Sequence, residues 1–383
     1  MLHSSLSRDA RTVSAPTRVY TYAQGVNDDT VVLATPEGLR MFFAGLAAGS
    51  PLSGALASST STDRGATWTA PAAVSDITSP ARKSVYAAMG IGAARLAGGF
   101  LSAWGAPASG IHLGLDPAVG DGELFGDSPV DAGVAVDSQS GQAIVAANLL
   151  DADGVAYAAP GGARSVIPRS GAAQLGHPVG VSGRIGAPGL FVAYTQGASE
   201  FLGRAAVWNV GAATGMVLGR RGDLRVSIAA GPAGRLWAFW FRRSPIDAVY
   251  ATRSNPEATR FGRVVRVKAP RGTESMFELT GEGSRGALDV LLLADAAGGT
   301  ANWHQRVLPG LTLKAEVHGN GKVTFSVTDA GDPVGRAKVA LVGGGSKTTG
   351  PDGTARFSLA RGRYRATARK PGYAPGTASA HIR

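Results

Sequence analysis

Cysteine and histidine, the usual side-chain ligands of transition metals, are absent or widely spaced in this chain. Cysteine is absent, which excludes disulfides and cysteine-ligated metals. The six histidines are scattered, so none forms a paired metal motif, and His304 is expected to be an ordinary strand residue. Asp151 and Asp153 imitate the start of a calcium loop, but Gly162 stands where such a loop needs a bidentate glutamate. No metal and no cofactor is therefore expected.

Aromatic and basic side chains offer a different chemistry, because tryptophan can stack on sugar rings and arginine binds carboxylates. The candidate ligand-binding residues are Trp104, Trp208, Trp240, Arg18 and Arg242. Trp237 and Trp240 have opposite parity on a strand, so only one of them can face a groove. No spacing of the arginines singles out a substrate-binding set, and no catalytic residue is assigned.

The most specific local pattern is Ser61-Thr62-Asp63-Arg64-Gly65-Ala66-Thr67-Trp68. Asp63 can accept hydrogen bonds from backbone N–H groups of its own turn, and Gly65 allows a positive φ. Ser61 closes the turn onto the preceding strand, and Trp68 packs back as an apolar plug. The pattern S-x-D-x-G-x-T-W resembles the Asp-box of the sialidase-like β-propellers, also named the BNR repeat. It indicates a fold more than an activity, and the alternative is an isolated polar turn beside a tryptophan.

A second, weaker copy runs from Ser254 to Phe261. It keeps the serine and places an aromatic residue seven positions later, but the aspartate and glycine of the box are missing. We interpret it as a degenerate Asp-box at the same point of a structural repeat. The alternative is a generic polar hairpin.

The resemblance implies a catalytic arrangement that can be compared with this chain. In sialidases three arginines bind the substrate carboxylate, a tyrosine activated by a glutamate is the nucleophile, and an aspartate is the acid/base. Here the opening strand, Thr17-Arg18-Val19-Tyr20, lacks the proline that sialidases carry after the arginine, and no tyrosine occurs between Ala251 and Gly310. A sialidase-like glycoside hydrolase is therefore an alternative rather than the leading hypothesis.

Self-similarity supports a repeat architecture. Six units, each an apolar run, a glycine-bearing turn and a second apolar run, recur at intervals of 45 to 56 residues, the length of a four-stranded propeller blade. They start at Val31, Ala87, Ala132, Val179, Arg225 and Glu278. The prediction is an all-β chain with a six-bladed β-propeller over residues 18–309, after an N-terminal extension of residues 1–17. A strand near Arg18 to Tyr22 is expected to pair with the last blade and close the ring.

The pattern changes after Leu308-Pro309-Gly310. Five alternating segments follow, from Leu311 to Lys370, and predict a small β-sandwich over residues 310–383. Pro333-Val334-Gly335-Arg336-Ala337-Lys338-Val339, Thr348-Thr349-Gly350-Pro351-Asp352-Gly353 and Lys370-Pro371-Gly372-Tyr373 resemble the carboxypeptidase-regulatory or Cna-B-like module. That resemblance implies a prealbumin-like or Ig-like accessory domain without chemistry of its own.

Positive charge is concentrated in this C-terminal segment. It holds 12 Lys and Arg against 4 Asp and Glu, a net charge of +8 out of +11 for the whole chain. Arg361, Arg363, Arg365 and Arg369 are separated by even intervals, so on a strand they share one face. Such a basic stripe can hold an anionic polymer through charge contacts, whereas the alternative is a solvated strand face.

These features favour a non-catalytic, exported β-propeller that binds a glycan or cell-surface polymer, with the sandwich as an accessory tail. The alternatives are a sialidase-like glycoside hydrolase and a protein-interaction scaffold. No specific nucleic acid partner and no transmembrane segment are expected. No signal peptide is visible near Met1, and an extracellular or cell-surface location is inferred from the family resemblance alone.

Overall fold

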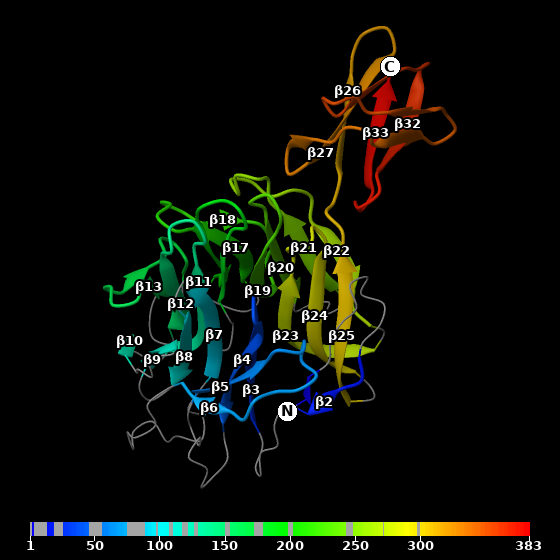
Figure 1. Ribbon diagram of the computed structural model, residues 1–383. Coiled ribbons are helices and arrows are strands. Elements are labelled where there is room, and N and C mark those ends of the chain that lie inside the picture. Colours follow the sequence, from blue (N-terminus) through cyan, green and yellow to red (C-terminus); the bar gives the residue numbers. More distant parts are fainter. Residues whose placement is uncertain are drawn as a thin grey trace. The chain divides into compact units, whose positions relative to one another are not determined.

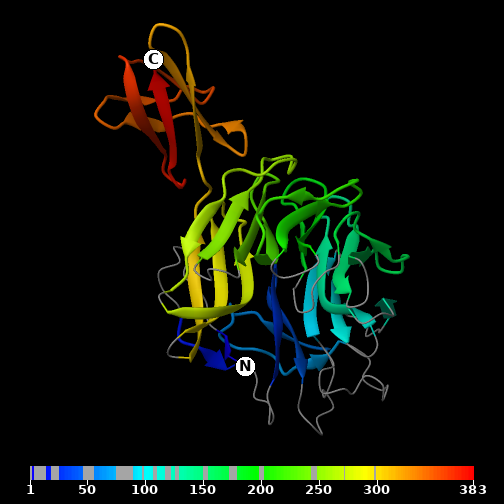
Figure 2. The same cartoon turned by 180° about the vertical axis from the view of Figure 1, so that it is seen from behind.

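The computed structural model is all-β in the residues it describes. These are 2–3, 14–18, 26–45, 56–74, 89–96, 99–106, 110–116, 122–125, 129–149, 154–171, 179–197, 202–242, 248–270, 272–296 and 299–383. They form two compact units, one of residues 1–183 and 188–227 and one of residues 184–187 and 228–383. Figure 1 shows the strands in sequence colours, and Figure 2 gives the reverse view.

Most strands are arranged in successive meanders, in which each strand is hydrogen-bonded to the next along the chain. The first two four-stranded meanders are β3 (Val26–Thr35), β4 (Gly38–Gly45), β5 (Leu56–Ser61) and β6 (Ala72–Ala73), then β7 (Met89–Leu96), β8 (Gly99–Ala106), β9 (Gly110–Asp116) and β10 (Gly122–Phe125). The third is β11 (Pro129–Val136), β12 (Ala143–Leu149), β13 (Val155–Ala158) and β14 (Ser165–Val166).

The later meanders repeat this order. They are β15 (Gly180–Gly183), β16 (Leu190–Gln196), β17 (Arg204–Asn209) and β18 (Met216–Val217), followed by β19 (Asp223–Ala230), β20 (Leu236–Arg242), β21 (Ala248–Arg253) and β22 (Val265–Lys268). A three-stranded sheet comes last, formed by β23 (Thr273–Glu282), β24 (Leu288–Ala296) and β25 (Gly299–Val307). Repeated four-stranded sheets of this kind are typical of a β-propeller.

The N-terminal strand differs from its prediction. Thr17 and Arg18 form β2 (Thr17–Arg18), which pairs with β1 (Leu2–His3) in a separate two-stranded sheet. The expected pairing of this segment with the last blade is therefore wrong for these two residues, because their backbone hydrogen bonds go to β1 instead. The rest of the predicted closing strand lies outside the described residues.

Buried apolar side chains from neighbouring meanders pack together in shared clusters. Leu101, Val134 and Val145 belong to a cluster shared by the second and third meanders, and Ile144, Val192 and Trp208 belong to one shared by the third and fourth. In β20 every residue from Leu236 to Phe241 is buried, as expected for a strand covered on both faces. β24 instead alternates, with Val290 fully buried and Leu291 48 % exposed.

The C-terminal module, residues 311–383, is built from two further sheets. One contains β26 (Thr312–Val317), β27 (Lys322–Asp329), β28 (Asp332–Pro333) and β31 (Thr354–Ser358). The other has the order β30 (Ser346–Thr348), β29 (Lys338–Leu341), β32 (Gly362–Arg369) and β33 (Gly376–Ile382). Every one of the five strands expected from the sequence is present, and β28, β30 and β33 are additional.

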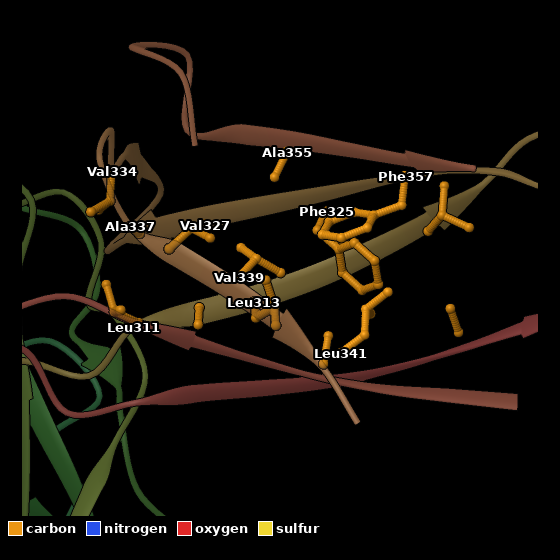
Figure 3. Close-up of a cluster of buried hydrophobic side chains, with 14 of the residues drawn as sticks. Leu311, Leu313, Phe325, Val327, Val334, Ala337, Val339, Leu341, Ala355 and Phe357 are labelled. Carbon is orange, nitrogen blue, oxygen red and sulfur yellow. The ribbon is translucent and has the colours of Figure 1, made fainter. Parts of the chain in front are cut away.

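One apolar cluster joins the two sheets of the module. It contains Val323, Phe325 and Val327 from β27 and Val339 from β29, and it includes no residue before Leu311. The rings of Phe325 and Phe357 meet edge to face with centroids 5.5 Å apart, and both point into the space between the strands in Figure 3. The module therefore has a core of its own.

None of the described residues forms a helix long and apolar enough to cross a membrane.

Candidate functional site

The predicted basic stripe lies on β32. Arg363, Arg365 and Arg369 are exposed, while the alanines between them face the core. Because side chains alternate along a strand, these three guanidinium groups share the outer face of the sheet. Arg361 precedes the strand in a bend and is exposed as well.

Neighbouring strands add one lysine and one histidine to this face. Lys338 on β29 pairs with Arg369, and His381 on β33 pairs with Arg363. Residues directly opposite each other in an antiparallel pair point to the same side, and both side chains are exposed. The four strands of this sheet contain no Asp or Glu. We call Lys338, Arg363, Arg365, Arg369 and His381 the basic face.

Two carboxylates of the module are held in ion pairs. Asp329 accepts a hydrogen bond from Arg253 and lies 3.7 Å from Nη1 of Arg235. Asp332 accepts from Arg235 at 2.7 Å, and Nη2 of Arg260 lies 3.4 Å away. These pairs remove negative charge from the module's surface, so its remaining surface is more basic than the sequence total indicates.

Arg263 ties the module to the chain before it through backbone oxygens. Its Nε donates to the carbonyl of Leu311 at 2.8 Å, and its Nη2 donates to that of Pro375 at 2.7 Å. Burial lowers the pKa of Arg263. Gly310 forms isolated bridges with Arg263 and Ala374. We call Arg235, Arg253, Arg260 and Arg263 the arginine junction.

The turn at Ser61 joins the third and fourth strands of the first meander. The Ser61 hydroxyl donates to Oδ1 of Asp63 at 2.8 Å and accepts the N–H of Gly65 at 2.7 Å. Asp63 also accepts the hydroxyl of Thr67 at 2.5 Å and its N–H at 2.8 Å. The Trp68 indole donates to the Gly65 carbonyl at 3.1 Å, and Gly65 has a φ of 91°. The hydrogen bonds of Ser61, Asp63, Thr67 and the Trp68 indole described here all close within the turn, so they are structural.

The hydrogen bonds of Asp63 have an electrostatic consequence. The hydroxyl of Thr67, followed by its N–H and the hydroxyl of Ser61, lowers the pKa of Asp63 to about 2. A hydrogen bond to the ionised form favours ionisation. The carboxylate is therefore charged throughout the neutral range and stabilises the turn in that form.

The turn at Ser254 joins the third and fourth strands of the fifth meander, and Ser254 forms an isolated bridge with Phe261. Its acceptor is Asn255, which the sequence reasoning missed. Oδ1 of Asn255 accepts the N–H groups of Thr259 at 2.9 Å and Arg260 at 3.1 Å. The side-chain acceptor comes one position earlier than in the first turn, and an asparagine after the serine is the signal that could have identified it.

Two of the predicted sugar-stacking residues belong to the core, which corrects the prediction. Trp208 is 1 % exposed and donates to the carbonyl of Ala212 at 2.8 Å. Trp240 is also 1 % exposed, stacks on Tyr250, and lies on a strand covered on both faces. The parity argument assumed one open face, but Trp237 on the other face is buried too.

Of the other predicted ligand-binding residues, only Arg242 has a side chain among the described residues. Arg242 is half-buried and lies 4.5 Å from the ring centroid of Tyr250, in a cation–π contact. Arg18 and Trp104 lie in β2 and β8, and their side chains are outside the described residues. Asp151 and Asp153 also fall outside them.

A polar cluster on the last sheet was not foreseen. Arg306 donates to Asp289 through Nε at 2.9 Å and through Nη2 at 2.8 Å, and His304 lies 3.1 Å from the same carboxylate. Burial opposes ionisation of Asp289, but the hydrogen bonds from Arg306 and His304 outweigh it and lower the pKa. Within the described ranges no three His, Asp or Glu side chains form a metal-binding group.

A scan against protein-family models finds no match, and a search of curated proteins finds no relative. Solved structures give weak similarities. An alpha-L-arabinofuranosidase from Clostridium thermocellum has 14 % identity and a TM-score of 0.37, covering 62 % of this chain and 93 % of that chain. The SapL1 lectin in complex with alpha methyl fucoside has 12 % identity, a TM-score of 0.39, and coverage of 76 % and 96 %. An exo-beta-1,3-galactanase from Phanerochaete chrysosporium has 11 % identity, a TM-score of 0.39, and coverage of 98 % and 96 %. At these identities and TM-scores no activity is transferred to this chain.

Proposed function

We propose that the protein is a non-catalytic, exported six-bladed β-propeller that binds an anionic glycan or cell-surface polymer, with a C-terminal β-sandwich as the polymer-binding tail. The observation that carries the proposal is the basic face. Arg363, Arg365 and Arg369 lie on one exposed strand face, Lys338 extends it sideways, and no carboxylate occurs in the four strands.

The geometry of this face suits a long ligand better than a small one. Alternate residues on a strand are about 7 Å apart, so Arg363 and Arg365 present two separate charges to an extended chain. Each guanidinium can form paired hydrogen bonds with a carboxylate, sulfate or phosphate. Several such contacts along a flexible polyanion add up, although each alone is weak in water.

The charge balance supports the same proposal. Asp329 and Asp332 are held by the arginine junction, which leaves Glu316 and Asp352 as the other carboxylates of the module. Both lie away from the basic face, in or beside the sheet that contains β26 and β31. A polyanion approaching the basic face therefore meets little opposing negative charge.

The experiment measures binding of the full chain to heparin, with dextran as a neutral polymer. The double variant Arg363→Gln/Arg365→Gln is expected to weaken heparin binding at least about tenfold, because two charge contacts are lost. The matched control is Lys322→Gln/Arg356→Gln, which removes two exposed charges from the other sheet. Equal losses in the two double variants would show that only net charge matters and would contradict the basic face.

The non-catalytic part of the proposal has a separate test. Fluorogenic sialosides, arabinosides and galactosides are incubated with the full chain, and no release above the rate in buffer is expected. Turnover of any of them would favour the glycoside hydrolase alternative instead.

A further inference from the structure

The fourth meander carries an open pocket of about 360 Å³ at one end of its sheet. It is lined by Gln196, Gly197, Leu202, Arg204 and Arg221. Its volume falls in the range of sites that hold small molecules. The pocket lies in the first compact unit and is separate from the basic face.

Strand register brings the lining residues together. Gln196 at the end of β16 pairs with Arg204 at the start of β17. Gly197 has a φ of 139°, and a Cβ there would lie 3.0 Å from the carbonyl oxygen of Leu202. Only glycine adopts this backbone without strain, and the missing side chain lets the backbone of Leu202 return close to Gly197.

Arg221 is positioned by the next turn. The N–H of Asp223 donates to the carbonyl of Gly203 at 3.1 Å, and the Asp223 carboxylate accepts the N–H of Arg220 at 2.5 Å. Asp223 is fully buried. It therefore acts as a positioning residue that fixes the turn of Arg220 and Arg221 beside Gly203.

The pocket presents two cations and one apolar side chain. Arg204 and Arg221 are exposed, and in the described part of the chain neither guanidinium has a hydrogen-bond or ion-pair partner. Leu202, two residues before Arg204, is 46 % exposed and lines the same pocket. The Gln196 amide nitrogen donates to the carbonyl of Arg169 at 2.6 Å, which leaves its oxygen as an acceptor.

We propose that this pocket binds an acidic sugar residue. Arg204 and Arg221 bind the oxyanion, a carboxylate or a sulfate ester, because two guanidinium groups match its charge and geometry. Leu202 contacts the apolar face of the sugar ring, and the Gln196 oxygen accepts a hydroxyl hydrogen. The inference rests on the proposed function, since it names the chemical class of a glycan that the propeller itself recognises.

Strand direction places the pocket at the opposite end of its meander from the turn that joins β17 and β18. In a meander, the β16–β17 connection and the chain leaving β18 lie at one end, whereas the β17–β18 turn lies at the other. The turns at Ser61 and Ser254 are of the second kind. A structural turn and a binding pocket thus occupy different ends of equivalent sheets.

The test uses the full chain and three small probes: methyl β-D-glucuronide, D-glucose 6-sulfate and neutral methyl β-D-glucoside. Binding is followed by ligand-observed NMR at millimolar concentration. One or both acidic probes are expected to bind and the neutral one is not, and Arg204→Gln or Arg221→Gln should weaken binding at least about tenfold. The control is Arg220→Gln, an exposed neighbour whose side chain does not line the pocket.

The variants distinguish binding at the pocket from binding at the basic face. Arg363→Gln/Arg365→Gln should lose heparin and keep the small acidic sugars, whereas Arg204→Gln/Arg221→Gln should do the reverse. No binding of either acidic probe, or equal weakening in Arg220→Gln, would overturn the pocket inference. In that case the proposed function would still stand or fall with the heparin binding of the Arg363→Gln/Arg365→Gln variant.

Discussion

The carboxylate of Asp329 and the guanidinium of Arg253 form an ion pair in which the side chains are only 3 % and 10 % exposed. Arg253 also donates to the carbonyl of Gly286 at 3.2 Å and lies 5.7 Å from the ring centroid of Tyr373. Residues far apart in sequence therefore share one desolvated charge pair. Such a pair constrains geometry more than it adds stability, but removing one partner leaves a buried charge uncompensated.

Replacement of this carboxylate should be costly. Asp329→Asn is expected to lower the free energy of unfolding by about 3 kcal/mol or more, because Arg253 keeps its charge in a buried place. Urea unfolding followed by tryptophan fluorescence measures the change. Asp332→Asn is the matched control, since Asp332 is 28 % exposed and should cost less. Equal losses in the two variants would contradict a special role for the buried pair.

The turn at Asp63 predicts a pH dependence. Its folded-state pKa of about 2 lies below the usual value of about 3.9 for an unfolded chain. The carboxylate therefore stabilises the fold above about pH 4, and this contribution is lost as the pH falls toward 2.

Thermal unfolding of the wild type and of Asp63→Asn between pH 7 and 2 tests this expectation. The wild type should be the more stable at pH 7, and the two midpoints should converge near pH 2. Glu316→Gln, at an exposed strand position, serves as the control. A constant difference across the whole range would show that the charge of Asp63 does not stabilise the turn.

The buried tryptophans predict a loss of stability without a loss of binding. Trp208→Ala and Trp240→Ala should each cost about 3 to 5 kcal/mol, as expected when a large side chain is removed from a packed core. Val342→Ala changes a side chain that is 70 % exposed and should stay within about 0.5 kcal/mol. Loss of glycan binding in a folded Trp208→Ala variant would restore the stacking interpretation.

The self-contained core of the C-terminal module predicts that a fragment of residues 311–383 folds. Its cluster of buried side chains begins at Leu311 and includes no earlier residue. Cooperative unfolding and dispersed NMR amide signals are expected, and the fragment should bind heparin with an affinity that falls steeply with salt. An unfolded fragment would show that the arginine junction is required for folding.

Local patterns predicted the strands well. Each predicted repeat start lies within the first strand of a sheet or at most two residues before it, for example Ala132 in β11 and Arg225 in β19. Alternating or continuous apolar runs carry this information locally. β33 (Gly376–Ile382) was missed because its buried positions include small residues such as Gly376 and Ala380, which give a weak apolar signal.

The site was less predictable because it depends on pairing between distant strands. The parity of Arg363 and Arg365 could be read from the sequence, but the pairing of Lys338 with Arg369 could not. The arginine junction joins Arg253, the last residue of β21, to Asp329, the last residue of β27, and no spacing rule predicts such a contact. Burial of Trp240 depends on the sheets that cover both faces of its strand, which a single strand's pattern does not report.

The contacts of Arg263 join the beginning and the end of the C-terminal module at one side chain. Its guanidinium donates to the carbonyl of Leu311, just before the first strand of the module, and to that of Pro375, just before the last strand. Because both acceptors are backbone oxygens, replacing the side chain at 311 or 375 leaves the two acceptors in place, whereas replacing Arg263 removes both hydrogen bonds at once. The two ends of the module therefore depend on the same guanidinium.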